Sequence, residues 1–168
     1  MVTQNTSPLL DELGFGEQFK DEIIEMLDST QMYSDFSGDD INMFAEYLHA
    51  YSAKEGAVIY QEGERAGHVC ILVKGRLKVL KSVGFGEDKK LVDVRPGKSI
   101  GEMSIIDGMP NSATVMVSTT STLLLLTKNN LQKVTLEHPA LGVKLLWHFA
   151  SLLSQRLRQT SGKLIDYL

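Results

Sequence analysis

The pattern of apolar residues changes near Ala50, and this change constrains the fold more than any other feature of the chain. Up to Ala50 the apolar residues recur at helical spacing, whereas from there to Lys128 they come in short runs separated by glycines. Short strands with frequent turn signals are typical of a barrel or a double-sheet roll. We therefore predict a mainly β protein with flanking helices. The predicted strands are Val58–Tyr60, Val69–Val73, Leu77–Leu80, Leu91–Val94, Thr114–Val117 and Thr122–Leu126.

Helices are predicted on both sides of this roll. Residues 1–35 are expected to be a helical extension, because Glu17–Leu27 repeats apolar residues about every 3.6 positions. Residues 36–168 form the main domain, in which Ser37 is an N-cap signal for a helix carrying Ile41, Phe44, Ala45 and Leu48. Pro139 begins a long C-terminal helix whose broad apolar face holds Leu141, Leu145, Phe149, Leu152 and Leu153.

Two connections inside the roll are predicted from turn residues. Gly75 separates two apolar runs and is expected to form a tight hairpin. The polar stretch Ser82–Lys90 contains glycines and is expected to be a hairpin loop.

Composition and charge narrow the class of protein. The single cysteine, Cys70, cannot form an internal disulfide and fits a reducing compartment. No run of 18 apolar residues exists, so we expect a cytoplasmic protein without a membrane span. Residues 1–50 carry eleven acidic residues and one basic residue, and an acidic surface repels nucleic-acid phosphates. We therefore expect no DNA binding by this chain alone.

The most informative segment for function is residues 101–115, which begins with Gly101 and has a Gly-Met-Pro break before a strand. The residues after Gly101 are predicted to form a short helical turn, whose free backbone N–H groups can hold an anion such as a phosphate. Glu102 is placed to accept a hydrogen bond from a sugar hydroxyl, and Ser112 to donate one to a phosphate oxygen. An ordinary corner of a roll gives the same pattern, so these residues alone leave both interpretations open.

This segment resembles the phosphate-binding cassette of the cyclic-nucleotide-binding family. Further motifs stand in the family's order at Gly56–Ile59, Glu62–Glu64, His68–Gly75 and Val94–Gly97. The resemblance covers about residues 36–163 and implies a jelly roll (double-stranded β-helix) followed by a long dimerisation helix. It also implies a ligand site composed of Gly101, Glu102, Met103, Ser104, Asn111, Ser112, Ala113, Thr160 and Ser161.

One cassette position departs from the family's pattern. Where the family has an arginine that pairs with the cyclic phosphate, this sequence has Asn111. A charge-assisted hydrogen bond is worth roughly 1.5–3 kcal/mol, which corresponds to about a ten- to hundred-fold change in affinity. We therefore expect weak or absent binding of cAMP, unless Lys98 or Arg95 supplies the missing charge.

The end of the C-terminal helix carries a second resemblance. Residues 155–163 are similar to the end of the family's dimerisation helix, where a threonine and a serine contact the adenine, one of them across the dimer. Thr160 and Ser161 hold those places. Together with the broad apolar face of the helix, this predicts a homodimer.

Two functions fit these observations. The first is a regulatory or sensor domain that binds a cyclic nucleotide or a related anionic ligand and signals to an effector protein. The second is a dimeric interaction module that has lost cAMP binding and acts without a ligand. We expect no enzymatic activity and no cofactor apart from a cyclic-nucleotide ligand. No metal site is expected, because the histidines are scattered along the chain at positions His49, His68, His138 and His148.

Overall fold

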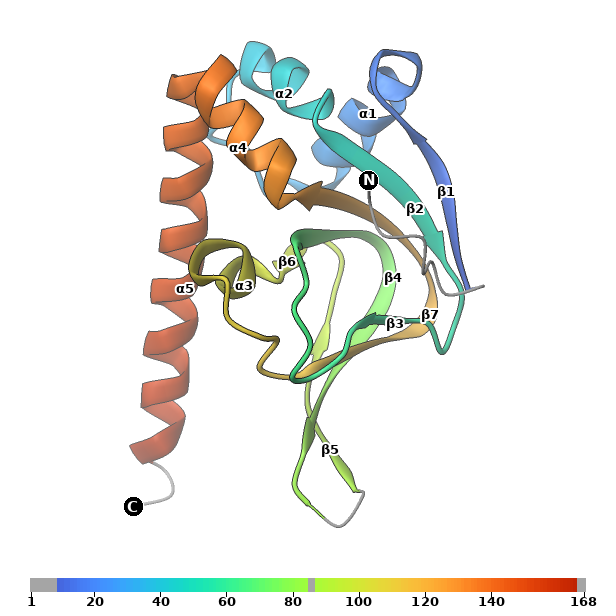
Figure 1. The fold of residues 1–168 in the computed structure, drawn as a ribbon, viewed down its shortest axis with the longest axis vertical. Helices are drawn as coiled ribbons and strands as arrows, with labels where there is room; N and C mark the ends of the chain where they lie inside the picture. The colour runs from blue at the N-terminus through green and yellow to red at the C-terminus, as the bar shows by residue number, and fades with distance from the viewer. Residues whose placement is uncertain (1–8, 85–86, 166–168) are drawn as a thin grey trace.

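A computed structural model describes residues 9–84 and 87–165 of the protein. Its strands form one curled antiparallel sheet, and helices flank it on one side and at one end (Figure 1). The predicted mainly β roll with a long C-terminal helix is confirmed. The elements in chain order are β1 (Leu10–Phe15), a 3-10 turn η1 (Glu17–Phe19), α1 (Lys20–Thr30), α2 (Gly38–Ala45), β2 (Leu48–Ala53), β3 (Val58–Tyr60), β4 (His68–Ser82), β5 (Asp88–Val94), β6 (Lys98–Ile100), α3 (Glu102–Asp107), β7 (Thr114–Thr127), α4 (Lys128–Glu137) and α5 (Pro139–Ile165).

Two long strands, β4 and β7, pair with each other and organise the roll. The first half of β4 also pairs with β6, and its second half pairs with β5. In the same way, the first part of β7 pairs with β3 and its last part pairs with β2. Because each long strand changes partners along its length, the sheet folds back on itself and encloses a core.

Gly75 lies inside strand β4 and does not form the predicted hairpin. Its φ of 98° belongs to the left-handed region that favours glycine. The pairing of β4 with β7 shifts register on both sides of it, as in a β-bulge. A Cβ at this position would also lie 2.7 Å from the Cα of Ser121. Gly75 therefore bends a continuous strand at the point where its partners change. The second predicted hairpin connection is present but shorter than expected, because β4 extends to Ser82 and β5 starts at Asp88.

The N-terminal region contains a strand that the sequence pattern does not predict. Strand β1 pairs with β2 ahead of the expected helix, which forms as η1 and α1. Most side chains of β1 are exposed, so the strand lacks the alternation of apolar and polar residues that would reveal it. Leu48, predicted on a helix, starts β2 instead. The capping box of Ser37 and Asp40 does begin α2, as the N-cap signal indicates.

Two clusters of buried side chains stabilise the domain. One fills the roll and includes Leu72, Val117 and Leu123. The other lies between the sheet and the helices and includes Ile23, Phe44 and Phe149. Strand β7 serves both clusters with alternate side chains, since Leu123 faces the roll while Leu124 and Leu126 face the helices.

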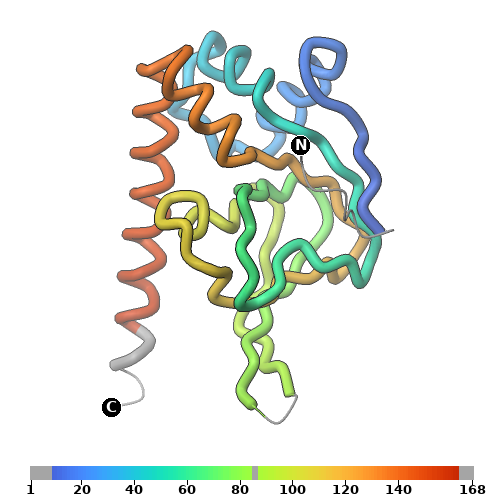
Figure 2. Tube along the Cα trace, viewed as in Figure 1, coloured from blue at the N-terminus to red at the C-terminus, as the bar shows by residue number. Residues whose placement is uncertain are grey.

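Helix α5 runs along the whole side of the molecule, past α4 and then past α3, while the β4–β5 hairpin projects from the far end of the roll (Figures 1 and 2). Leu141, Leu145 and Phe149 of its predicted apolar face are fully buried against the domain. A different stripe of apolar residues is exposed: Val143, Leu146, Trp147 and Leu157. Within the described ranges, no helix is long and apolar enough to cross a membrane.

Candidate functional site

The turn between β6 and β7 is built around two glycines and a buried tyrosine. Gly101 has a φ of 93° and a Cβ there would lie 2.8 Å from the carbonyl oxygen of His68, so this position requires glycine. The Tyr60 hydroxyl occupies the same space, 3.0 Å from the His68 carbonyl oxygen and 3.2 Å from that of Ile100. Helix α3 follows directly and ends at Gly108, whose φ is 69°. Tyr60 thus fixes the start of the segment predicted to bind ligand.

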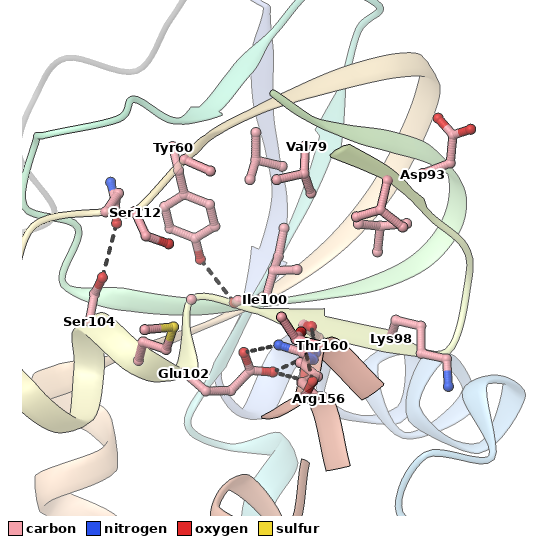
Figure 3. Close-up of a pocket in the computed structure, with 18 of the residues that line it drawn as sticks. Tyr60, Val79, Asp93, Lys98, Ile100, Glu102, Ser104, Ser112, Arg156 and Thr160 are labelled. Atoms are coloured by element: carbon pink, nitrogen blue, oxygen red, sulfur yellow. Dashed lines mark hydrogen bonds and ion pairs between the residues drawn. The ribbon is translucent and has the colours of Figure 1, made fainter. Parts of the chain in front are cut away.

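A cavity of about 470 Å³ lies between this segment, the β4–β5 hairpin and α5 (Figure 3). Its size falls within the range of sites for small molecules. Eight of the nine predicted site residues line it: Gly101, Glu102, Met103, Ser104, Asn111, Ser112, Ala113 and Thr160. Ser161 is exposed and is not one of the lining residues. The sequence therefore located the cavity, and the roles of these residues in binding remain predictions.

One end of the cavity, here named the carboxylate end, consists of Ser99, Glu102 and Arg156. Glu102 is 1% exposed, and its Oε2 lies 2.9 Å from an Nη atom of Arg156 on α5. The second Nη of Arg156 donates to the Ser99 carbonyl oxygen at 2.5 Å, and the Ser99 hydroxyl donates to Glu102. A buried carboxylate needs such partners, because an unpaired charge loses its hydration without compensation.

Arg156 was not predicted as a site residue, although the sequence contains a signal for it. Thr160 lines the cavity from α5, and residues four positions apart share one face of a helix. The residue one turn before Thr160 is Arg156, and the Thr160 hydroxyl donates to its carbonyl oxygen at 2.9 Å. The contact between Arg156 and Glu102 links residues 54 positions apart, and no local pattern reveals such a pairing.

The other end of the cavity, here named the amide end, consists of Ser104, Asn111 and Ser112. The Asn111 side chain is buried, and its amide nitrogen donates to the Gln61 carbonyl oxygen at 3.1 Å. Its amide oxygen accepts from the Ser104 hydroxyl at 3.1 Å. The Asn111 backbone is also paired, because its N–H donates to Glu64 at 2.8 Å and its carbonyl oxygen accepts from Gly63 at 2.9 Å. Asn111 therefore closes a neutral hydrogen-bond network where the family's pattern has a cation.

The two cations that sequence analysis offered as substitutes do not lie at the amide end. Lys98 lines the cavity, but Figure 3 shows it on the opposite side of the view from Ser104 and Ser112. Arg95 is not one of the lining residues. A lysine that the sequence did not single out lies closer: Lys81 Nζ is 2.7 Å from the Ser112 carbonyl oxygen and 2.5 Å from Glu62 Oε1. Its ammonium and the Ser82 N–H hold the pKa of Glu62 below its ordinary value.

The wall behind Gly101 is neutral at physiological pH. The His68 ring stacks on Tyr60 with ring centroids 4.9 Å apart, and burial lowers the pKa of His68 to about 4. Burial also raises the pKa of the Tyr60 hydroxyl well above its ordinary value. Glu102 and Arg156 carry the charges of the carboxylate end, and Asp93 and Lys98 also line the cavity. Among the described residues, no three histidine, cysteine or acidic side chains gather at metal-binding geometry.

Comparison with known proteins identifies the class to which this fold and cavity belong. The family model of the cyclic nucleotide-binding domain matches residues 51–138. The chain is therefore a member of the cyclic nucleotide-binding domain family.

Solved structures and curated relatives agree with this assignment. A cyclic nucleotide-binding domain from Methylobacillus flagellatus KT superposes with a TM-score of 0.84 at 27% identity, covering 98% of this chain and 93% of that one. A CRP-like cAMP-activated global transcriptional regulator of Mycobacterium tuberculosis is 23% identical over 128 residues, which are 76% of this chain and 55% of the relative. The chain thus spans about half the length of that curated relative.

A third neighbour shares the fold alone. The regulatory subunit of a cAMP-independent protein kinase A from Trypanosoma brucei superposes with a TM-score of 0.66 at 17% identity, covering 82% of this chain and 52% of that one. A triple mutant of that subunit is described as bound to cAMP in its A site. The fold therefore occurs in the regulatory subunit of a protein kinase A described as cAMP-independent, while the curated sequence relative is described as a cAMP-activated regulator.

Proposed function

We propose that this chain is a non-catalytic regulatory domain that binds an anionic nucleotide in the 470 Å³ cavity and transmits binding through α5 to an effector protein. The observation that carries the proposal is the contact between Glu102 and Arg156. It places the carboxylate of the predicted binding segment and the C-terminal helix at the same point of the cavity. A ligand that engages either side chain therefore acts on α5 directly.

Glu102 and Arg156 provide the chemistry to recognise a sugar. The carboxylate accepts hydrogen bonds and the guanidinium donates them, so a ribose hydroxyl can bond to both. The Glu102–Arg156 contact would rearrange as the hydroxyl enters, and α5 would shift with it. Thr160, one turn further along α5, would contact the base of the same nucleotide.

The proposal predicts weak binding of cAMP by the natural protein, since Asn111 carries no charge. The test is calorimetry with cAMP on the natural protein and on Asn111→Arg. The arginine should increase the affinity by about ten-fold or more, because it adds a charged, bidentate partner for the phosphate. Sub-micromolar binding by the natural protein would contradict the expected weakness.

The Asn111 network also favours the second function, a ligand-independent module. Every polar group of Asn111 already has a protein partner, so the segment is ordered without a ligand. If Asn111→Arg folds and still binds no member of a cyclic-nucleotide panel, this second function is the better account. A thermal-shift screen gives the same answer at lower cost, because a bound ligand raises stability.

We infer that the chain forms a homodimer through the exposed stripe of α5. Val143, Leu146, Trp147 and Leu157 lie on one side of the helix, and their exposed fractions range from 42% to 71%. Four large apolar residues on one helix are a patch of the kind that marks protein contacts. Trp147→Glu should therefore give a monomer by sedimentation, while Leu136→Glu on α4, which is even more exposed but lies off the stripe, should leave the dimer intact. A monomeric natural protein at tens of micromolar would contradict the dimer.

A further inference from the structure

We propose that Lys81 replaces the missing cassette arginine, so that the ligand's phosphate is held between the Lys81 ammonium and Ser112. The proposal rests on the proposed binding of an anionic nucleotide in the cavity, and it assigns the residue that supplies the charge. No motif points to Lys81. Its role follows from where β4 places it.

The pairing of β4 with β7 brings Lys81 next to the binding segment. Leu80 is in register with Thr114, so Lys81 stands beside the residues that immediately precede β7. Side chains alternate between the two faces of a strand, and Val79, two residues earlier, lines the cavity. Lys81 itself is not one of the lining residues, but its Nζ lies 2.7 Å from the carbonyl oxygen of Ser112, which lines the cavity. This places an ammonium at the rim of the amide end.

The ammonium has a donor left for a ligand. A lysine carries three N–H donors, and Lys81 uses one for Ser112 and one for Glu62 Oε1 at 2.5 Å. Its side chain is 43% exposed and that of Glu62 is 25% exposed, so solvent weakens their attraction. A phosphate entering beside Ser112 could accept the third N–H and compete with Glu62 for the charge. Glu62 thus limits how much positive charge the amide end presents.

The other cations around the cavity are less suited to this role. Arg156 is bonded to Glu102 and Ser99 at the carboxylate end. Lys98 lies on the far side of the cavity from Ser112 (Figure 3). Lys89 is in register with Lys81 on the neighbouring strand, and this second ammonium raises the positive potential at the same rim. Among the described side chains, Lys81 is the lysine whose Nζ directly contacts a residue of the amide end.

The experiment compares cAMP with adenosine, which has the same base and sugar but no phosphate, on the full chain. Lys81→Met should lower cAMP affinity by about ten-fold, the low end of the loss expected for a charged hydrogen bond, and leave adenosine binding unchanged. Glu62→Gln should raise cAMP affinity several-fold, because it frees the ammonium. If the Glu62–Lys81 pair has a purely structural role, both Lys81→Met and Glu62→Gln should lower cAMP affinity. Lys133→Met is the control, since Lys133 is exposed on α4 and is not one of the residues that line the cavity.

The Asn111→Arg background separates this proposal from the proposed function. Two outcomes would show that the cavity binds nucleotide but that Lys81 does not supply the charge for its phosphate. In the first, Asn111→Arg binds cAMP while the natural protein does not. In the second, Lys81→Met leaves the cAMP affinity of the natural protein unchanged. If neither the natural protein nor Asn111→Arg binds cAMP or adenosine, the proposed function fails and the role of Lys81 fails with it. Both the proposed function and the role of Lys81 would be supported if Lys81→Met lowers cAMP affinity ten-fold and the addition of Asn111→Arg to that variant restores it.

Discussion

The carboxylate end and the amide end of the cavity are both held by hydrogen bonds, but they use different groups. At the carboxylate end, Glu102 and Arg156 carry opposite charges and join α3 to α5. At the amide end, Asn111 joins the segment before β7 to the strand region around Gln61 with neutral groups alone. The difference indicates that the carboxylate end depends on helix α5, whereas the hydrogen bonds of Asn111 at the amide end are made within the roll.

This difference has an energetic counterpart. Glu102 is buried while the Arg156 side chain is 40% exposed. Removing the cation that pairs with a buried carboxylate leaves that charge without compensation, which is strongly destabilising. Removing a neutral amide leaves hydrogen-bond partners unsatisfied at a lower cost. The two ends can therefore be distinguished by how strongly single substitutions change the free energy of unfolding.

Arg156→Met should have the largest effect. Glu102 would stay buried at 1% exposed without its cation, and we expect unfolding to become easier by roughly 2–4 kcal/mol. Chemical denaturation monitored by circular dichroism measures this value. Arg158→Met on the exposed side of the same helix is the matched control, with an expected change within about 0.5 kcal/mol. Equal effects of the two variants would show that the carboxylate end does not depend on the charge pair.

Acid should weaken the wall that supports the carboxylate end. His68 stacks on Tyr60 and has a pKa of about 4 in the fold, below its ordinary value of 6.5. Because the unfolded chain binds the proton more readily, stability due to neutral His68 is present above pH 6.5 and is lost as the pH falls toward 4. The loss is on the order of 3 kcal/mol. In His68→Gln the free energy of unfolding should change less between pH 6.5 and 4 than in the natural protein. The same pH dependence in both proteins would contradict the role given to His68.

Asn111→Ala should have a smaller effect, confined to the amide end. The Gln61 carbonyl oxygen and the Ser104 hydroxyl would each lose a partner, at a combined cost of about 1–2 kcal/mol. Ser112→Ala is the control, because Ser112 is exposed, and it should change stability by less than about 0.5 kcal/mol. A loss as large as that of Arg156→Met would mean that the amide network, and not the ion pair, dominates the stability of the cavity.

The sequence predicted the binding segment well, because its chemistry is local. Gly101, Glu102, Asn111 and Ser112 lie within twelve residues, and the structure places all of them on one cavity. The long helix from Pro139 was predicted by its apolar periodicity, which a 27-residue helix displays clearly. Features that depend on a few neighbouring residues could thus be read directly.

Features that depend on contacts between residues far apart in the sequence could not be predicted from it. Lys81 and Arg156 reach the cavity through strand register and helix docking, and both look like ordinary surface residues in the sequence. Gly75 was predicted to end a strand because glycine marks hairpins and bulges alike, and only the pairing with β7 decides between them. Strand β1 was missed because its exposed residues give no alternating pattern.

The hydrogen bonds of Asn111 affect the entropy of binding. A loop that becomes ordered only around its ligand gives up conformational freedom at that moment, and this loss weakens the affinity. Here the Asn111 backbone is already held by Glu64 and Gly63, and the Asn111 side chain by Gln61 and Ser104. A ligand that enters the cavity therefore meets a preorganised segment with little mobility left to lose. Asn111 thus lacks the charge of the family's arginine but adds order to the segment, and the second effect partly offsets the first.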